Sequence, residues 1–279
     1  MTAINTNVSA LNARLAAISA DTKQSRAMER LSSGKRVNSA ADDAAGLAVA
    51  GKMQAQLRGI NMAVRNAQDG MGLVQTAEAG LNEIRQMVLR IRELAVQMAN
   101  GIYESADRKN AQLEVVELRG QINLIADNTR FNNVVLLGGG DISKLGAIIQ
   151  AGPTTAEKIT MKINDMSTNA TGGALSSVNT VCVSTATLSL SAMTTMDAAL
   201  SKISSELATL GSYQNRLEYS SANLAAASVK TETAIGRVLD ADFASETTNL
   251  SKQQILNQAA TAMLAQANQS KANLITLIQ

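Results

Sequence analysis

Leu81-Asn-Glu-Ile-Arg-Gln-Met-Val-Leu-Arg-Ile-Arg-Glu-Leu-Ala-Val-Gln-Met98 carries the clearest pattern in the chain. Its apolar residues alternate at spacings of three and four, at Leu81, Ile84, Val88, Ile91, Ala95 and Met98. Strict alternation of this kind keeps one side of a helix turned toward a partner helix, which is coiled-coil packing. The stretch therefore predicts a helix that packs along another helix.

The same phase extends upstream of this stretch. It passes through Glu78 and includes Met53, Leu57, Ile60, Val64, Ala67, Met71 and Val74. At 1.5 Å per residue the whole run would be roughly 70 Å long. Glycines at 59, 70, 72 and 80 oppose a helix, each by about 0.5–1 kcal/mol relative to Ala, and Asp69-Gly70 also fits a turn. Because the apolar phase does not slip, we expect one long helix.

Two further runs have the same spacing, one near the start of the chain and one after its middle. The first contains Ile4, Val8, Leu11, Leu15 and Ile18, and the second contains Met193, Met196, Leu200, Ile203, Leu207, Leu210, Gln214, Leu217, Ser221 and Leu224. Between them, Ser105-Ala-Asp-Arg predicts an N-cap at Ser105 and a shorter helix through Ile125. These runs predict a mainly α fold, a long coiled-coil helical bundle.

The middle of the chain, about residues 131–191, loses the helical phase. It collects glycines, the single Pro153 and many Ser and Thr, and Lys158-Ile-Thr-Met-Lys-Ile163 alternates as a strand does. We expect a small β-hairpin region there, followed by a polar connection back into the helices. The chain then folds back on itself, with its N- and C-terminal helices paired.

Composition argues against several classes of function. The 25 basic and 23 acidic residues give a net charge of +2, too balanced to indicate a nucleic-acid surface. The chain has no His, the commonest general base and a frequent metal ligand, and Cys182 is its single cysteine. We therefore expect no enzyme activity, no cofactor, no metal site and no disulfide within the chain.

Sequence signals for targeting are also absent. No run of eighteen apolar residues would span a membrane. Met1-Thr-Ala-Ile-Asn-Thr-Asn lacks the basic and apolar regions of a secretory signal peptide. Taken alone, these features favour a cytoplasmic protein.

Two local motifs suggest chemistry but lack its context. Gly46-Leu-Ala-Val-Ala-Gly51-Lys52 resembles a phosphate-binding loop without the final Ser or Thr, and no apolar strand precedes it. Asp42 and Asp43 could form a carboxylate pair, but adjacent residues on a helix point apart. Acidic charge at a helix N-terminus is the simpler interpretation of the two aspartates.

The C-terminal segment predicts a buried surface. Residues 251–279 contain only two charged side chains, Lys252 and Lys271. Their apolar stripe consists of Ile255, Ala259, Met263, Leu274 and Leu277. Left uncovered, such faces at both ends of the chain would be adhesive. Two alternatives stay open: the two termini pair only with each other, or they pair and also pack against further copies.

Several stretches, in order along the chain, resemble the bacterial flagellin family. They are Ile4-Asn-Thr-Asn-Val-Ser-Ala-Leu-Asn12, Leu31-Ser-Ser-Gly-Lys-Arg-Val-Asn-Ser-Ala-Ala-Asp-Asp-Ala-Ala-Gly-Leu-Ala48, Gln75-Thr-Ala-Glu78, Arg92-Glu-Leu-Ala-Val-Gln97, Asn128-Thr-Arg-Phe-Asn132, Met263-Leu-Ala-Gln-Ala-Asn-Gln269 and Leu274-Ile-Thr-Leu-Ile278. The similarity covers the N-terminal half and the last hundred residues. With little room for an insert between them, the chain looks like a compact flagellin that lacks large outer domains.

The resemblance implies a layered architecture. Residues 1–44 and 240–279 would pair as the coiled coil of an inner filament core, and residues 45–239 would form a helical rod domain around it. The segment with Arg36, Asn38, Asp42 and Asp43 would be the spoke between the two layers. The residues implied for filament-core assembly are Ile4, Val8, Leu11, Leu15, Ile255, Met263, Leu274 and Leu277.

The resemblance also implies a function and its partners. The chain would be a structural subunit that polymerises into the bacterial flagellar filament for swimming motility. It would be secreted unfolded by the flagellar type III apparatus and would lie outside the cell. Its partners would be itself, an export chaperone, and the filament cap and junction proteins. The rival interpretations are a hook–filament junction protein and a flagellin-like enzyme with a catalytic insert.

One further site is implied by the resemblance alone. In flagellins sensed by the vertebrate Toll-like receptor for flagellin, an Arg and a Leu on one helix and a Glu on the next contact the receptor. Arg90, Leu94 and Glu114 stand at the matching positions. Leu89 stands where that pattern usually has Gln.

Overall fold

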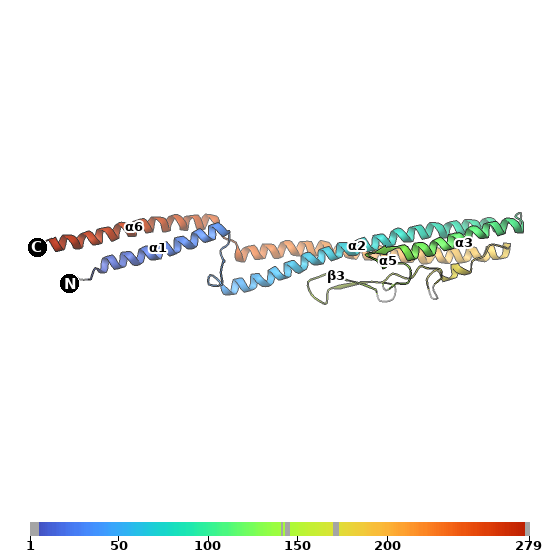
Figure 1. Cartoon of the computed structure of the whole chain (residues 1–279), viewed down its shortest axis with the longest axis horizontal. Helices are drawn as coiled ribbons and strands as arrows, with labels where there is room; N and C mark the ends of the chain where they lie inside the picture. Colours follow the sequence, from blue (N-terminus) through green and yellow to red (C-terminus); the bar gives the residue numbers. More distant parts are fainter. Residues whose placement is uncertain (1–5, 141, 143–145, 170–172, 277–279) are drawn as a thin grey trace. The chain divides into compact units, whose positions relative to one another are not determined.

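The structure is a computed structural model that describes residues 6–140, 142, 146–169 and 173–276, with side chains up to residue 273 (Figure 1). The helices are α1 (Val8–Ser33), α2 (Ala44–Ala99), α3 (Ser105–Asn128), α5 (Ala186–Leu239) and α6 (Phe243–Thr276), with a short 3-10 helix, η1 (Ser176–Thr180). The strands are β1 (Arg130–Phe131), β2 (Val134–Val135), β3 (Ala147–Gln150) and β4 (Lys158–Met161). The prediction of a mainly α fold with a small β-hairpin region is confirmed.

The chain divides into two compact units. The first unit contains Met1–Leu57 and Val229–Gln279, and the second contains Arg58–Ser228. Both α2 and α5 continue from one unit into the other. The first unit joins the two ends of the chain, because α1 pairs with α6 within it.

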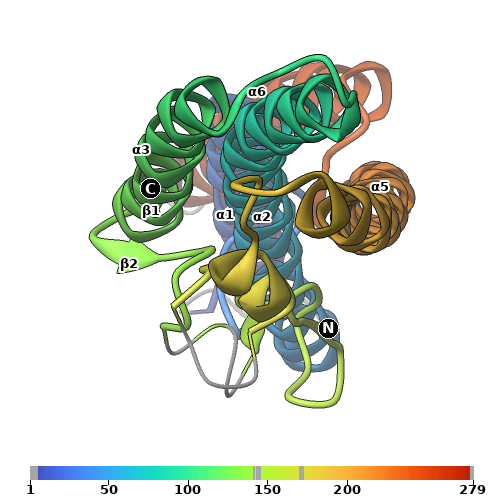
Figure 2. The same cartoon turned by 90° about the vertical axis from the view of Figure 1, so that its right-hand side faces the viewer.

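The second unit is built on the long seam between α2 and α5. Viewed end-on, α2 lies between α3 and α5 (Figure 2). The apolar run that predicts α2 forms the core, with Ala67, Val74, Leu81, Ile84, Val88, Ile91, Ala95 and Met98 buried. From α5 the buried residues include Met196, Ile203, Leu210 and Leu217. The heptad periods therefore identify the core of this unit correctly, and α2 is one helix without a turn at Asp69-Gly70.

Glycines inside α2 let other parts of the second unit come close. A Cβ on Gly80 would lie 2.7 Å from Thr129 Oγ1 and 2.9 Å from Leu137 Cδ1. A Cβ on Gly59 would lie 3.0 Å from the Cβ of Pro153, in the β3–β4 hairpin. These positions accept the helix-propensity cost of glycine because the neighbouring chain approaches the helix backbone.

Two hairpins follow α3. β1 pairs with β2 across a turn in which Asn132 and Asn133 both have positive φ, as a two-residue type I′ turn requires. β3 pairs with β4 in antiparallel register, from Ala147 opposite Met161 to Gln150 opposite Lys158. The strand expected at residues 158–163 is present as β4, which ends at Met161 and whose alternate residues Ile159 and Met161 are buried.

Two predicted boundaries differ from the structure. Helix α3 begins at Ser105, and its N-cap is Glu104, whose backbone N–H donates to Asp107 Oδ2 at 3.3 Å. The predicted cap at Ser105 is therefore wrong by one residue. Helix α5 begins at Ala186, inside the region expected to be irregular.

Among the described residues, no helix combines the length and apolarity needed to cross a membrane.

Candidate functional site

The pairing of α1 with α6 brings the two ends of the chain together. Asn7 Oδ1 accepts a hydrogen bond from Ala10 N at 3.1 Å, which caps α1. The same side chain reaches the other helix, because Asn7 Nδ2 donates to Ala267 O at 3.0 Å. At the opposite end of the pair, Arg30 of α1 lies 4.0 Å from Glu246 of α6. The two helices therefore run antiparallel.

Small residues form the α1 side of the contact between these helices. Ala20 and Ala27 of α1 are 4% and 2% exposed, and Ala260 of α6 is 8% exposed. We call the α1 side of this contact the alanine seam; it consists of Ala10, Ala13, Ala17, Ala20 and Ala27, spaced as a heptad row. On α6 the half-buried residues follow the same spacing at Gln253, Asn257, Leu264 and Ala267. The terminal pair is thus a coiled coil with an alanine contact.

The larger apolar residues of α1 lie on the other side. Val8, Leu11, Leu15 and Ile18, here called the outward row, are between 51% and 66% exposed. Val8 and Ala10 are two residues apart, or about 200° around a helix with 3.6 residues per turn. The outward row therefore faces away from the alanine seam, and α6 is not the helix that covers it.

Helix α6 also keeps large apolar side chains exposed. Ile255, Met263 and Leu256 are 65%, 63% and 45% exposed. Leu274 lies in α6, but its side chain is outside the described part of the structure, as are the whole of Ile4 and Leu277. The structure thus places the described members of the predicted assembly set on the surface of the first unit.

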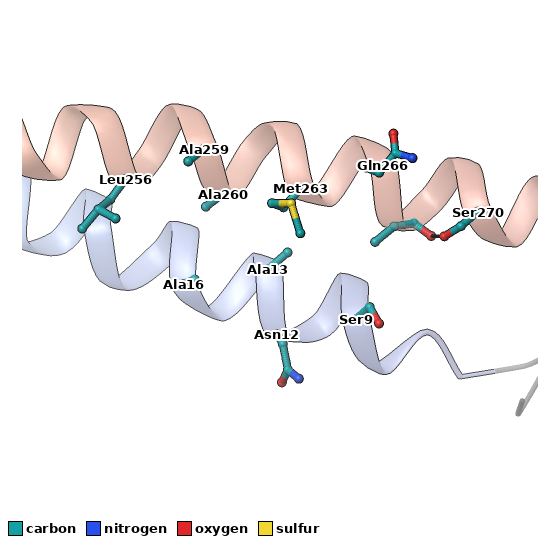
Figure 3. A pocket seen from close by; sticks show the side chains of 11 residues that line it. Ser9, Asn12, Ala13, Ala16, Leu256, Ala259, Ala260, Met263, Gln266 and Ser270 are labelled. Carbon is teal, nitrogen blue, oxygen red and sulfur yellow. Dashed lines mark hydrogen bonds between the residues drawn. The ribbon is translucent and has the colours of Figure 1, made fainter. Parts of the chain in front are cut away.

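A groove follows one side of the α1–α6 pair. Its volume is about 630 Å³, and Figure 3 shows Leu256 and Met263 of α6 turned toward α1, where Ala13 and Ala16 leave space. Ser9 and Gln266 lie at the end of the groove nearest the start of α1. Among the described residues that line it, most are apolar and none is charged. An apolar groove beside an exposed apolar row suits protein–protein contact.

The predicted spoke segment follows the C-terminal end of α1 and is held there by hydrogen bonds, which we call the clamp. Gly34 ends α1 with φ 70°, and Ala241 N donates to Gly34 O at 3.0 Å. Arg36 N donates to Leu239 O at 2.6 Å, and Arg36 Nη2 donates to Val238 O at 2.8 Å. The end of α1 is therefore fixed to the α5–α6 connection within the first unit.

Asp42 and Asp43 have different partners, as adjacent residues at a helix start should. Asp43 Oδ1 accepts from Gly46 N at 2.8 Å and so caps α2. Asp42 Oδ2 accepts from Ser39 N, Ser39 Oγ and Asn38 N, and Oδ1 lies 3.7 Å from Arg30. These hydrogen bonds, above all from the Ser39 and Asn38 backbone, hold the pKa of Asp42 below its usual value of 3.8.

The candidate chemical sites find no support in the geometry. Gly46–Lys52 lies inside α2, so its backbone N–H groups belong to the helix and cannot surround a phosphate. Cys182 is a free, half-buried thiol with Sγ 3.1 Å from Ser184 Oγ. Within the described ranges, no three His, Cys, Asp or Glu side chains cluster as metal ligands do.

The residues matched to the innate-receptor pattern come together only in part. Arg90 Nε donates to Glu114 Oε1 at 2.8 Å, and Nη1 donates to Glu93 Oε2 at 3.3 Å. The hydrogen bond to Glu114 is the main cause that raises the pKa of Arg90. Leu94 is only 3% exposed and belongs to the core of the second unit. Of the three matched residues, only Arg90 and Glu114 are exposed at the surface.

Sequence reasoning missed the alanine seam and the contacts of Asn7 and Arg30. The signal for the seam was present as a heptad row of alanines two positions from the outward row. It is weak because alanine has little apolar area beside Leu, Ile or Val. Asn7 and Arg30 bond across long sequence separations, which no local pattern reveals.

Comparisons with known proteins support one family. Residues 4–141 match the family described as "Bacterial flagellin N-terminal helical region", and residues 193–278 match "Bacterial flagellin C-terminal helical region". The chain is 38% identical to a flagellar filament 31.3 kDa core protein of Treponema maltophilum and 38% identical to a flagellin of Bacillus subtilis, each over 99% of both chains. A crystal structure of Bacillus cereus flagellin is 31% identical, with a TM-score of 0.50 over 57% of this chain and 88% of that one.

Proposed function

Because this chain belongs to the bacterial flagellin family, we propose that its subunits polymerise through the exposed apolar surfaces of the terminal helices α1 and α6. The chain is a structural subunit of the flagellar filament that serves swimming motility, and it is not an enzyme. Its place is in the extracellular filament. The proposal concerns which residues make the filament.

The exposure of the outward row carries this proposal. Fully burying a Val, Leu, Ile or Met side chain stabilises by about 1.5–3 kcal/mol. Leu15 and Met263 keep more than 60% of their surface exposed to solvent in the isolated subunit. Most of the stabilisation from burying them is therefore still to be gained on assembly. Pairing of α1 with α6 uses the alanine seam and leaves these residues uncovered. Further copies are the partners that a filament supplies.

The spoke residues and the layers are part of the same proposal. Residues 1–44 and 240–279 form the inner core of the filament, and residues 45–239 form the layer around it. Arg36, Asn38, Asp42 and Asp43 connect the layers, since Arg36 binds the end of α5, Asp42 accepts from Asn38 and Asp43 caps α2. Ile4, Leu274 and Leu277 extend the assembly surface toward the ends of the chain.

Seeded polymerisation tests the proposal. Purified subunits are added to short filament fragments, and elongation is followed by light scattering and electron microscopy. The intact chain is expected to elongate the fragments, and a chain without residues 251–279 is not. Leu15→Ser should slow elongation, whereas Leu15→Met, which keeps the apolar area, should not. Equal elongation by Leu15→Ser and the intact chain would remove the outward row from the interface.

The same experiment separates the junction-protein alternative. A hook–filament junction protein would add to a fragment without forming a long tube. Long tubes from the intact chain would therefore exclude it. No observation on this chain favours that alternative.

Export and further partners are finer proposals. We infer secretion by the flagellar type III apparatus, with an export chaperone, and contact with cap and junction proteins at the filament ends. A Toll-like receptor contact would use Arg90 and Glu114, which are exposed, with Leu94 supporting them from the core. Receptor signalling by the intact subunit, compared with Arg90→Ala and Glu114→Ala, tests this contact. Equal signalling by all three chains, or none by the intact chain, would contradict it.

A further inference from the structure

The side of the α1–α6 pair that carries the apolar groove changes character along its length. Beyond the groove lies a second pocket of about 250 Å³, lined by Lys23, Arg26 and Arg30 of α1 and by Glu246, Asn249 and Gln253 of α6. Ser9 and Ala16 of the groove and Lys23 and Arg30 of the pocket are seven residues apart, so they lie on one side of α1. We call this side the acceptor face. It is apolar toward the start of α1 and cationic toward its end.

The outward row of α1 has a matching order. Its apolar residues lie in the first half of the helix, and the two carboxylates of α1, Asp21 and Glu29, lie in the second half. Glu29 continues the heptad spacing of the row from Ile18, and Asp21 lies beside it. Residues 6–20 contain no acidic side chain. The row is therefore apolar and then acidic, where the acceptor face is apolar and then cationic.

We propose that the outward row of one copy docks on the acceptor face of a second copy, with the two α1 helices pointing in the same direction. The proposal rests on the proposed function, because it takes a second copy as the occupant. Parallel docking places Leu11 and Leu15 over the apolar groove. It also brings Asp21 and Glu29 to the level of Lys23 and Arg26. The proposal thus states both the surface and the direction of the contact.

Antiparallel docking is disfavoured by the same residues. It would place the carboxylates of Asp21 and Glu29 against the apolar groove and the outward row against Lys23 and Arg26. A charge taken from water without a partner is strongly destabilising, whereas an exposed ion pair adds little. The charges therefore select the direction, and the apolar contact supplies the affinity.

The charged groups are available for such a contact. Within the part of the chain that the structure describes, Asp21, Lys23 and Arg26 form no ion pair. Arg30 lies near Asp42 and Glu246, at 3.7 and 4.0 Å. Glu29 Oε1 accepts from Asn38 Nδ2 at 3.1 Å and remains exposed. Asp21, Lys23 and Arg26 are therefore the charges that a second copy would meet without an ion-pair partner in the described structure.

The two surfaces differ, and this decides the type of assembly. The outward row and the acceptor face lie on different sides of one helix pair, so each copy can use both at once. A contact between different surfaces is heterologous, and it continues from copy to copy instead of closing a twofold dimer. The docking mode therefore produces a ring or a helical array.

Cysteine cross-linking tests the contact in filaments. Leu15→Cys and Met263→Cys are made in separate Cys182→Ser chains, one with a size tag, and the two are mixed, assembled and oxidised. A disulfide between the two chain types is expected, and none within either type alone. Ala262→Cys, one residue away and exposed, replaces Met263→Cys as the matched control and should not cross-link to Leu15→Cys. Filaments that give only like-with-like cross-links, or none, would overturn the docking mode.

Charge reversal tests the direction without cysteines. Asp21→Lys with Glu29→Lys, or Lys23→Glu with Arg26→Glu, should each slow elongation about tenfold through like-charge repulsion. The chain with all four changes should elongate its own fragments within about threefold of the intact chain. A fourfold variant as slow as either pair would contradict the proposal. If the intact chain formed no filament at all, the proposed function would fail instead, so the two failures are distinguishable.

Discussion

Gln214 of α5 donates a hydrogen bond from Nε2 to Oε2 of Glu78 of α2 at 2.8 Å. Both residues interrupt heptad runs that are otherwise mostly apolar, and both are half-buried. Each polar side chain thus finds its partner in the other across the seam. A polar pair inside a coiled-coil seam fixes the register, because a shift along the helices would leave both groups without partners.

Gln214→Leu is expected to destabilise the second unit by about 1–3 kcal/mol, because Glu78 keeps its burial and loses its donor. Urea unfolding followed by circular dichroism measures the effect. The double variant Gln214→Leu with Glu78→Leu should recover most of the loss, since no polar group is then left unpaired. A double variant as unstable as the sum of the two single changes would show that the pair is not coupled.

Ile91→Ala should lower the free energy of unfolding by about 2–5 kcal/mol, because Ile91 is fully buried between the helices and its removal leaves a cavity. Leu15→Ala should change it by no more than about 0.5 kcal/mol, because that side chain is 66% exposed. Elongation should show the opposite order. Leu15→Ala should slow filament elongation more than its small loss of stability would suggest. Thermal melts of the monomer and seeded growth, measured on both variants, test this separation of folding from assembly.

Gly80→Ala is expected to destabilise the second unit although alanine favours helices, because the new Cβ would lie 2.7 Å from Thr129 Oγ1. Gly120→Ala is the matched control in α3, where nothing lies within 4 Å of the new Cβ. That change should stabilise by about 0.5–1 kcal/mol. Urea midpoints that rise for both variants would contradict the close approach at Gly80.

The network around Asp42 predicts a pH dependence at the spoke. The folded pKa of Asp42 is lowered from 3.8, so its ionised form stabilises the clamp above that pH. The contribution is lost as the pH falls through the lower folded pKa. Protection of the Asn38 and Ser39 amides from hydrogen exchange should therefore be greater in the intact chain than in Asp42→Asn at pH 7. Protection factors that differ equally at pH 7 and in strong acid would count against this role.

The sequence predicts the second unit well because its seam residues are large. Leu81, Ile84, Val88 and Ile91 differ strongly in hydrophobicity from their neighbours, so the period of the helix is visible. Helix α2 also forms despite its glycines, because their unfavourable helix propensity is smaller than the stabilisation from burying the apolar residues of the run. The β4 strand is visible for the same reason, since Ile159 and Met161 alternate with polar residues.

The first unit is harder to predict because it carries two apolar rows. The outward row is the stronger signal, and the sequence alone leaves open whether it faces the partner helix within the chain or a further copy. The alanine seam is weaker in area but allows close approach of α1 and α6, and it takes that place. The hydrogen bonds of Arg36 to Val238 and of Asn7 to Ala267 depend on this approach. They join residues more than 200 positions apart, which propensity and periodicity do not address.

Because of the alanine seam, the melting temperature of the α1–α6 pair should depend on assembly. A buried methyl group contributes far less than a buried leucine, so α1 and α6 hold each other only weakly. A neighbouring copy that binds only the paired helices stabilises the pair by mass action. This stabilisation grows as the concentration of that copy rises above its dissociation constant. The terminal helices should therefore melt at a temperature that the filament sets, well above the one that a single subunit sets.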